Sequence, residues 1–417
     1  MTTITRSFLS FVFFGIINNI LYVVILTAAH DLVPPTTPKA IILLADILPS
    51  FLLKLALPFF IHRIKYRVRI ICIVALSSIG MFLTSLPIPL AYVLLGIVLA
   101  SASTGLGETT FLQLCHYYES ECIHGWSTGT GAAGFLGAGM FLLFTTVFKW
   151  RVDWTLRAFA IAPLAILIVY QFYLPTTSRN LQLQESDINL INDEQIRFTL
   201  GSNTAKYFNL SNEPNEFELE GELESTQITN LKIHYKKTIN KVIPYIIPYM
   251  LPLMLVYFAE YTINQGVSPT LLFPIETTPF SKYRDLYVTY GTIYQIGVFI
   301  SRSTGQYLRL ENLYILSILQ MGNLIILILQ SIFMYIQTFW VICAIILFEG
   351  LLGGAGYVNT FSQVRETTKE SDREFALGCV GISDSMGVVI AAIVSIFLET
   401  QLCKYQVHND KNWCTLL

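Results

Sequence analysis

Seven charged side chains lie inside apolar stretches of the 417-residue sequence, where lipid and not water would surround them. A charged group at the bilayer centre costs at least about 2.5–3.5 kcal/mol on insertion scales, so each one is a candidate for a function. Carboxyl groups at that depth could bind protons or a cationic solute, and basic groups could hold an anion or close a gate. The seven are Asp46, Lys54, Glu108, Glu260, Arg302, Glu349 and Asp384.

Polar residues near positions 18 and 260 form two stripes at helical spacing. Positions i, i+3, i+4 and i+7 share one face of a helix, so each stripe would face one neighbour or one cavity. The stripes consist of Gly15, Asn18, Asn19 and Tyr22, and of Tyr257, Glu260, Tyr261 and Asn264 with Gln265 beside them.

The composition shows which elements must position these groups. Hydrophobic residues make up 53% of the chain, whereas charged residues make up 13%, about half of the roughly 25% typical of a soluble domain. The apolar residues come in blocks of about 20, the length that crosses a bilayer core as a helix. A soluble enzyme is therefore excluded, and the net charge of −2 offers no basic face to a nucleic acid.

Eleven apolar stretches are candidates for membrane spans. Only helices and closed barrels satisfy their own backbone in lipid, and these stretches lack the period-2 alternation of a barrel. We therefore predict an all-α, polytopic membrane protein with about 11 transmembrane helices. The predicted spans are 7–29, 40–61, 68–86, 90–113, 128–148, 155–174, 242–263, 284–302, 313–334, 338–358 and 376–399.

A charged segment divides these spans into two groups. Residues 175–241 carry 17 charges and no sustained apolar face, which predicts a disordered cytosolic loop. The loop separates a six-helix bundle (1–174) from a five-helix bundle (242–400) and a tail (401–417). With a cytosolic N-terminus, cytosolic segments hold 17 Lys and Arg residues against 8 on the other side, so the positive-inside rule favours that orientation.

The polar groups follow the order of the spans. Spans 1, 4, 7 and 10 carry the asparagine pair and three glutamates, and a period of three spans is typical of secondary transporters with a site near the midplane. The alternative is that each group merely hydrogen-bonds between helices. The predicted solute and ion pathway contains Asn18, Asn19, Tyr22, Asp46, Lys54, Glu108, Tyr257, Glu260, Asn264, Gln265, Gln295, Arg302, Glu349 and Asn359.

The sequence contains no recognised motif of ATP binding, hydrolysis or metal binding. No GxxxxGK[ST] loop is present, which argues against ATP-driven transport. No HExxH or GxSxG motif occurs either. We therefore predict no enzyme activity, no cofactor and no metal site.

Two short motifs bear on sorting and on the tail. Tyr207 and Leu210 begin and end a Tyr-x-x-Φ pattern, a form recognised by cytosolic sorting adaptors. Cys414 opens a C-terminal prenylation box, which would require a cytosolic tail. Eleven spans place the tail on the other side, where Cys403 and Cys414 would be candidates for a lumenal disulfide. We favour the span count and leave both alternatives open.

Eight blocks of sequence, in order, resemble the battenin family, which contains the lysosomal membrane protein lost in Batten disease and its fungal vacuolar counterparts. They touch both bundles but not the loop at 175–241. The blocks are NNILYVVILTAAHDLV from Asn18, ADILPSFLLKL from Ala45, GLGETTFLQL from Gly105, WSTGTGAAGFLGA from Trp126, YFAEYTINQG from Tyr257, YQIGVFISRS from Tyr294, EGLLGGAGYVNTF from Glu349 and REFALGCVGISDSMG from Arg373.

The resemblance implies a fold related to the major facilitator superfamily, in which helices 1, 4, 7 and 10 line the central cavity. It also implies a multi-pass protein of the vacuolar or lysosomal membrane with a role in organelle pH and solute balance, connected with basic amino acids or glycerophosphodiesters. Five acids against two bases inside the membrane favour basic amino acids or protons. The rival hypothesis is a non-transporting scaffold that regulates the proton pump or trafficking through the long loop.

Overall fold

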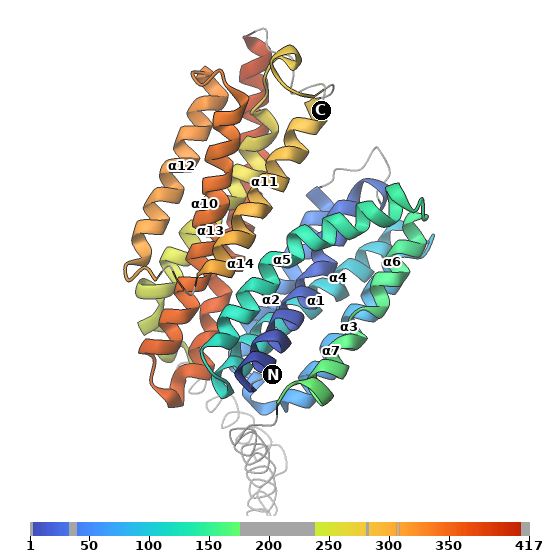
Figure 1. Cartoon of the computed structure of the whole chain (residues 1–417), viewed down its shortest axis with the longest axis vertical. Coiled ribbons are helices and arrows are strands. Elements are labelled where there is room, and N and C mark those ends of the chain that lie inside the picture. Colours follow the sequence, from blue (N-terminus) through green and yellow to red (C-terminus); the bar gives the residue numbers. More distant parts are fainter. Residues whose placement is uncertain are drawn as a thin grey trace, which may run out of the picture.

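The computed structural model describes residues 3–32, 40–175, 238–280, 283–305, 307 and 309–409. These residues are helical with short connections and include no strand. They form two bundles that lie side by side (Figure 1). Tyr207, Leu210 and Cys414 fall outside the described residues, as does the loop between 176 and 237, so the sorting and prenylation hypotheses stay predictions.

Within the described residues, the N-terminal bundle contains six helical units. Five are single long helices, and the sixth is built of two helices and a π-helical turn. They are α1 (Thr3–Leu32), α2 (Ala40–Ala56), α3 (Tyr66–Thr84), α4 (Leu90–Leu114), α5 (Glu121–Leu142) and the unit formed by α6 (Val152–Ile161), α7 (Leu164–Ile168) and η5 (Val169–Tyr173).

The C-terminal bundle contains five such units, and the first spans Thr238–Thr270. Pro248 and Pro252 lie in that unit, and proline lacks the N–H needed for a regular helix. The backbone takes a π-helical turn there, as helices do where the hydrogen-bond ladder is interrupted. The units are η6 (Ile246–Met250) with α10 (Leu251–Thr262) and η7 (Ile263–Val267), then α11 (Tyr283–Thr304), α12 (Leu313–Phe333), α13 (Phe339–Thr367) and α14 (Glu370–His408).

Within the described residues, nine helices are long and apolar enough to cross a membrane, against eleven predicted spans. The two that differ are α2, which has 17 residues, and α11, which is comparatively polar. Both pack along a spanning partner, α2 against α4 and α11 against α13. The prediction of an all-α, polytopic membrane protein is confirmed.

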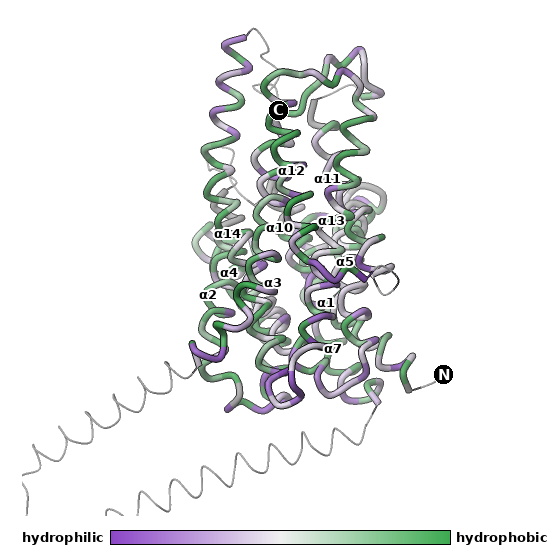
Figure 2. Tube along the Cα trace, turned by 90° about the vertical axis from the view of Figure 1, so that its left-hand side faces the viewer, coloured by the Kyte–Doolittle hydropathy of each residue, from purple (hydrophilic) through white to green (hydrophobic). Residues whose placement is uncertain are grey.

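Several helices extend beyond the predicted spans, among them α1, α13, α5 and α14. Helix α5 begins at Glu121 and not at residue 128, and α14 runs to His408, into the segment predicted as a tail. Hydrophilic residues mark the upper part of α14 (Figure 2). A hydropathy window detects only the most apolar part of such a helix, so the predicted spans are shorter than the helices.

The outer faces of the bundles carry large apolar side chains. Phe172, Ile318 and Phe397 are 78%, 68% and 67% exposed, respectively. A soluble protein rarely exposes apolar surface on this scale, whereas lipid covers it without cost. The apolar blocks of the sequence therefore supply both the core and the lipid-facing surface.

The two bundles repeat the same pairings of helices. Helix α1 packs on α5 as α10 packs on α14, and α2 packs on α4 as α11 packs on α13. Across the interface, α2 meets α14 and α5 meets α11. Internal repeats of this kind place a transporter's binding site between the repeats.

Glycine allows the close approach of α1 and α5. A Cβ added to Gly129 would overlap the backbone oxygen of Val12, and one added to Gly15 would lie 2.6 Å from the backbone oxygen of Trp126. Small residues at such crossings let backbones touch. Gly129 therefore serves the packing of α1 against α5.

We expect Gly129→Ala to destabilise the protein by about 1–3 kcal/mol, because α1 and α5 must move apart to admit the methyl group. Thermal unfolding of the purified protein in detergent measures the effect as a lower melting temperature. Gly139→Ala on the same helix is the control, since a Cβ there meets nothing within 4 Å. Equal melting temperatures for the two variants would contradict the packing argument.

Candidate functional site: a charged cavity between the bundles

A cavity of about 160 Å³ lies between the two bundles. Its walls come from α1, α2, α4 and α5 on one side and from α10, α11, α13 and α14 on the other. These are the first, second, fourth and fifth units of each bundle, so the two halves contribute equivalent elements. The cavity therefore lies on the interface between the two halves and is lined by equivalent elements of each.

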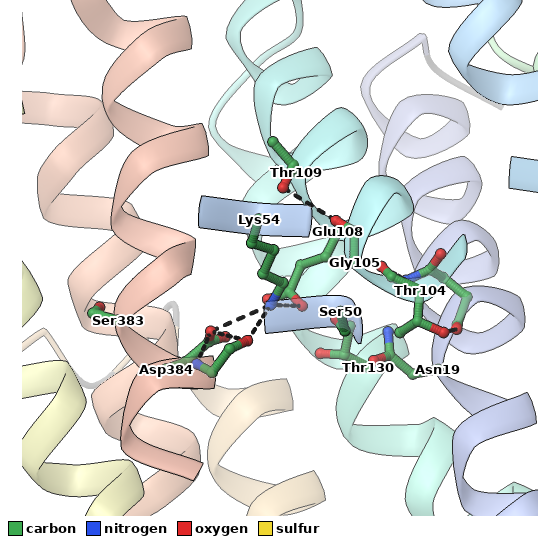
Figure 3. A network of polar contacts seen from close by, with 12 residues as sticks. Asn19, Ser50, Lys54, Thr104, Gly105, Glu108, Thr109, Thr130, Ser383 and Asp384 are labelled. Atoms are coloured by element: carbon green, nitrogen blue, oxygen red, sulfur yellow. Dashed lines mark hydrogen bonds and ion pairs between the residues drawn. The ribbon is translucent and has the colours of Figure 1, made fainter. Parts of the chain in front are cut away.

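A buried lysine joins the halves at this cavity. Lys54 Nζ on α2 lies 2.6 Å from Glu108 Oε2 on α4 and 3.3 Å from Asp384 Oδ1 on α14, and it donates a third hydrogen bond to Ser385 Oγ at 2.7 Å. Figure 3 shows the ammonium group between the two carboxylates. All three donors of the ammonium are thus used, and the side chain is only 3% exposed.

A second cation, Arg302 of α11, also joins the halves. Its Nη1 donates to Thr130 Oγ1 on α5 at 2.6 Å, and its Nη2 donates to Tyr257 OH on α10 at 2.9 Å. The guanidinium lies 4.4 Å from the centroid of the Tyr357 ring, a cation–π distance. Its Nε is buried without a hydrogen-bond partner, so the group retains capacity to bind an anion.

Tyr357 links the charged groups to the packed interior. Its hydroxyl accepts a hydrogen bond from Trp126 Nε1 at 2.8 Å and lies 3.5 Å from Glu108 Oε1. Trp126 is fully buried on α5, whereas Tyr357 is on α13. This chain fixes the second oxygen of Glu108 and adds a further contact between the halves.

Eight of the fourteen residues predicted for the pathway line the cavity. Their side chains come from both bundles, and their role in transport stays a prediction. They are Asn19, Tyr22, Asp46, Lys54, Glu108, Tyr257, Gln295 and Arg302.

Two of the other six predicted residues serve as local links between helices. Asn18 Nδ2 donates to the backbone oxygen of Thr104 at 3.2 Å and thereby joins α1 to α4. Asn359 accepts from the backbone N–H of Leu310 at 2.8 Å, so it fixes the connection after α11. These contacts match the alternative of hydrogen bonds between helices. The six that do not line the cavity are Asn18, Glu260, Asn264, Gln265, Glu349 and Asn359.

Several cavity residues were absent from the predicted pathway. Asp384 was recognised as an intramembrane charge but was not placed in the pathway, and it supplies one carboxylate around Lys54. Tyr261, Tyr294 and Tyr357 were also left out of the pathway, because an aromatic ring in an apolar span looks like core. The additional polar lining residues are Ser50, Thr104, Thr130, Tyr261, Tyr294, Tyr357, Asp384 and Ser385.

A second polar cluster closes the interface at one end of the bundles, near Pro175 and Thr238. Glu374 on α14 accepts hydrogen bonds from Tyr66 OH at 2.6 Å and from Tyr117 OH at 2.9 Å. Arg365 on α13 donates to the backbone oxygens of Cys115 and Tyr118. These side chains, which we call the end clamp, hold the C-terminal bundle against the start of α3 and the segment that follows α4.

The described residues contain six cysteines. Five described cysteines are free, whereas Cys403 on α14 is disulfide-bonded. Within the described residues, no group of three or more His, Cys, Asp or Glu side chains could hold a metal ion.

The fold defines the class of the protein. The proton:xylose symporter XylE of the major facilitator superfamily matches with a TM-score of 0.57 at 11% identity, over 99% of this chain and 92% of that chain. A bacterial homologue of the iron transporter ferroportin, in an outward-facing state, matches with a TM-score of 0.54 at 11% identity, over 100% and 97%. Identities this low establish the fold alone, which is major-facilitator-like.

The sequence defines the family. The model of the CLN3 protein family matches residues 9–405. Protein BTN1 of Yarrowia lipolytica is 50% identical over 97% of this chain and 96% of its own length, and protein BTN1 of Saccharomyces cerevisiae is 45% identical over 97% and 96%. The chain belongs to the CLN3, or battenin, family, which confirms the resemblance seen in the sequence.

Proposed function

We propose that the chain is a secondary transporter of the vacuolar (lysosomal) membrane, involved in vacuolar transport and organelle pH homeostasis, which carries a basic amino acid by alternating access. The observation that carries the proposal is the Lys54 ammonium held between carboxylates of opposite halves. The family and the major-facilitator-like fold support a membrane transporter, and the relatives' fungal origin supports the vacuole.

The cavity offers a site for a cationic group. An ammonium or guanidinium group of a solute has the same chemistry as Lys54 and would compete with it for Glu108 and Asp384. Exchange of one cation for another keeps both carboxylates paired, so neither is left charged and unpartnered in a low-dielectric site. Because the carboxylates belong to different halves, the exchange would also loosen the bridge between them.

The opposite end of an amino acid requires a donor for its carboxylate. Arg302 lines the same cavity and has an unpartnered Nε, and a guanidinium binds carboxylates with good geometry. The contact of Arg302 with Thr130 on the other half makes the same side chain a latch. Solute binding would therefore act on two links between the halves.

A glycerophosphodiester is the second candidate solute, and Arg302 is the observation that favours it. A phosphodiester anion fits a guanidinium as well as a carboxylate does. The acids of the cavity, Asp46, Glu108 and Asp384, outnumber its bases, Lys54 and Arg302. This balance ranks the basic amino acid first.

Uptake of labelled arginine into vacuoles isolated from yeast lacking its own relative, with and without this chain, tests the proposal. We expect uptake only with the chain, and inhibition by unlabelled lysine but not by glycerophosphocholine. We expect Glu108→Gln and Asp384→Asn to lower it about tenfold or more, because a hydrogen bond to a charged group contributes about 1.5–3 kcal/mol.

Glu366→Gln is the matched control, because it makes the same change at an exposed surface ion pair with Arg309 outside the cavity. Inhibition by glycerophosphocholine alone would replace the basic amino acid by the second candidate. Equal uptake in vacuoles with and without the chain, for both solutes, would refute the transport proposal.

A further inference from the structure

Two glutamates lie in the C-terminal bundle behind the cavity wall. Glu260 on α10 is 2% exposed and Glu349 on α13 is fully buried. Neither lines the cavity, so neither contacts a solute bound there. From the sequence, such carboxyl groups were expected to bind protons or the cationic group of a solute. Because these two lie outside the cavity, the proton is the ligand that remains for them.

One asparagine connects the two acids. Asn264 Nδ2 donates to Glu349 Oε1 at 2.9 Å and to the backbone oxygen of Glu260 at 3.1 Å. Asn264 lies one helical turn after Glu260, in the π-helical turn η7 that continues α10. Its amide there reaches Glu349 on α13. The amide supplies one donor to Glu349 and leaves its other oxygen, Oε2, without a partner.

A glycine shows how closely the carboxyl group of Glu260 approaches α13, the helix that carries Glu349. Gly353 lies one turn after Glu349 on α13, and a Cβ added there would overlap Glu260 Oε2. The carboxyl group of Glu260 thus lies against α13 one turn after Glu349. Oε2 of Glu260 is also buried without a hydrogen-bond partner.

The charges around this pair do not balance if both acids are ionised. The one basic side chain that acts on Glu260 is Arg302, whose Nη atoms are held by Thr130 and Tyr257. One guanidinium offsets one carboxylate, and a second buried carboxylate without a cation is too costly to keep ionised. The other titratable groups facing the pair are phenols: Tyr257 and Tyr261 on α10 and Tyr294 on α11.

The remaining helices around the pair do not change this balance. Helix α12 packs against α10 and carries no Asp, Glu, Lys, Arg or His. Helix α14 brings Asp384, which acts on Tyr257 and Tyr261 from the cavity side and is itself bound to Lys54. The surplus negative charge of the pair is therefore local.

We propose that Glu260 and Glu349 share one exchangeable proton and form a proton-binding site that is separate from the solute cavity and linked to it by Tyr294. Tyr294 lines the cavity and donates its hydroxyl hydrogen to Glu260 Oε1. The coupling of this proton-binding site to solute movement rests on the proposed function, whereas proton binding by the pair does not.

Proton entry from the cavity balances as a relay. A hydronium ion in the cavity gives a proton to the Tyr294 oxygen, while Tyr294 passes its own hydroxyl proton to Glu260 Oε1. One O–H bond forms on Glu260, the O–H bond of Tyr294 is replaced, and water is left behind. The negative charge of the pair falls by one, and no other reactant is needed.

Infrared spectroscopy of the purified protein in lipid tests proton binding without any solute. We expect a carbonyl stretching band of a protonated carboxylic acid at neutral pH, which disappears reversibly as the pH is raised. Glu349→Gln should lose this band, because the remaining carboxylate, that of Glu260, is offset by Arg302. Glu260→Gln should keep a band but shift its pH dependence, because it removes the negative charge that acts on Glu349. Glu366→Gln, at the surface, should keep it.

An unchanged band in both variants would overturn the proposal, and so would its absence from the unmodified protein at every pH at which the protein stays folded. Elution as a single species in size-exclusion chromatography shows that each variant is folded. Asp46 is another buried acid that could contribute a band of its own. Asp46→Asn removes that contribution and should leave the pH-dependent band of the glutamate pair in place.

Transport in proteoliposomes tests the coupling. We expect Glu349→Gln to abolish arginine accumulation driven by a pH gradient, while exchange of labelled for unlabelled arginine persists. Tyr294→Phe should keep the infrared band and slow gradient-driven uptake. Gradient-driven uptake by Glu349→Gln at the rate of the unmodified protein would overturn the coupling. Absence of arginine exchange in the unmodified protein would instead count against the proposed solute, and the infrared result would still decide proton binding.

Discussion

Lys54→Met is expected to destabilise the protein by about 3 kcal/mol, because removing one member of a buried ion pair leaves the other charged and unpaired. Two carboxylates depend on Lys54, and the side chains of Glu108 and Asp384 are only 12% and 7% exposed. Methionine has nearly the length of lysine and leaves no large cavity, so the loss reports the charge. Thermal unfolding in detergent at neutral pH measures it.

The triple variant Lys54→Met, Glu108→Gln, Asp384→Asn is the matched control. It removes all three charges together, and replacing a complete buried ion pair by neutral groups is often close to neutral for stability. We therefore expect it to recover most of the stability lost in Lys54→Met. A single variant as stable as the unmodified protein would show that Lys54 does not hold the two carboxylates.

The sequence predicts the helices better than it predicts their contacts. Burial of a charge is costly, which indicates that Lys54 needs a partner, but hydropathy does not say which. Its partners lie 54 and 330 positions away along the chain, and only the packing of α2 against α4 and α14 brings them together. A stripe at helical spacing predicts a shared face, and the neighbours of that face follow from the fold.

Because the sequence does not show which helices are neighbours, it also placed residues in the pathway that do not line the cavity. Asn359 and Glu349 lie ten positions apart on α13, and both looked like pathway residues because both are polar within an apolar span. One fixes the connection after α11, and the other lies behind the cavity. Tyr294, which donates a hydrogen bond to Glu260 and also lines the cavity, joins that buried region to the cavity.

The largest expected effect on conformation comes from Arg365 in the end clamp. Alternating access requires the halves to separate where they now touch, and Arg365 binds the backbone oxygens of Cys115, the C-cap of α4, and of Tyr118 just after it. A cation is favourable there because the helix dipole leaves partial negative charge on those oxygens. Arg365 is 8% exposed, so water cannot replace its hydrogen bonds while the halves are closed.

We expect Arg365→Met to increase the rate at which a maleimide labels Cys115 by about tenfold or more, because hydrogen bonds to a charged group contribute about 1.5–3 kcal/mol. Cys115 is a natural reporter, since its thiol is free and its side chain is fully buried beside the clamp. The measurement uses purified protein carrying Cys72→Ser, which removes the exposed thiol.

Arg309→Met controls for the loss of a basic residue, because Arg309 forms an exposed ion pair with Glu366 outside the clamp. Its labelling rate should match that of the unmodified protein. Glu374→Gln keeps acceptors for the two tyrosine hydroxyls but loses the charge, so it should have a smaller effect than Arg365→Met. If Arg365→Met labels no faster than Arg309→Met, the clamp does not limit separation of the halves at this end, and the links at Lys54 and Arg302 would have to hold them alone.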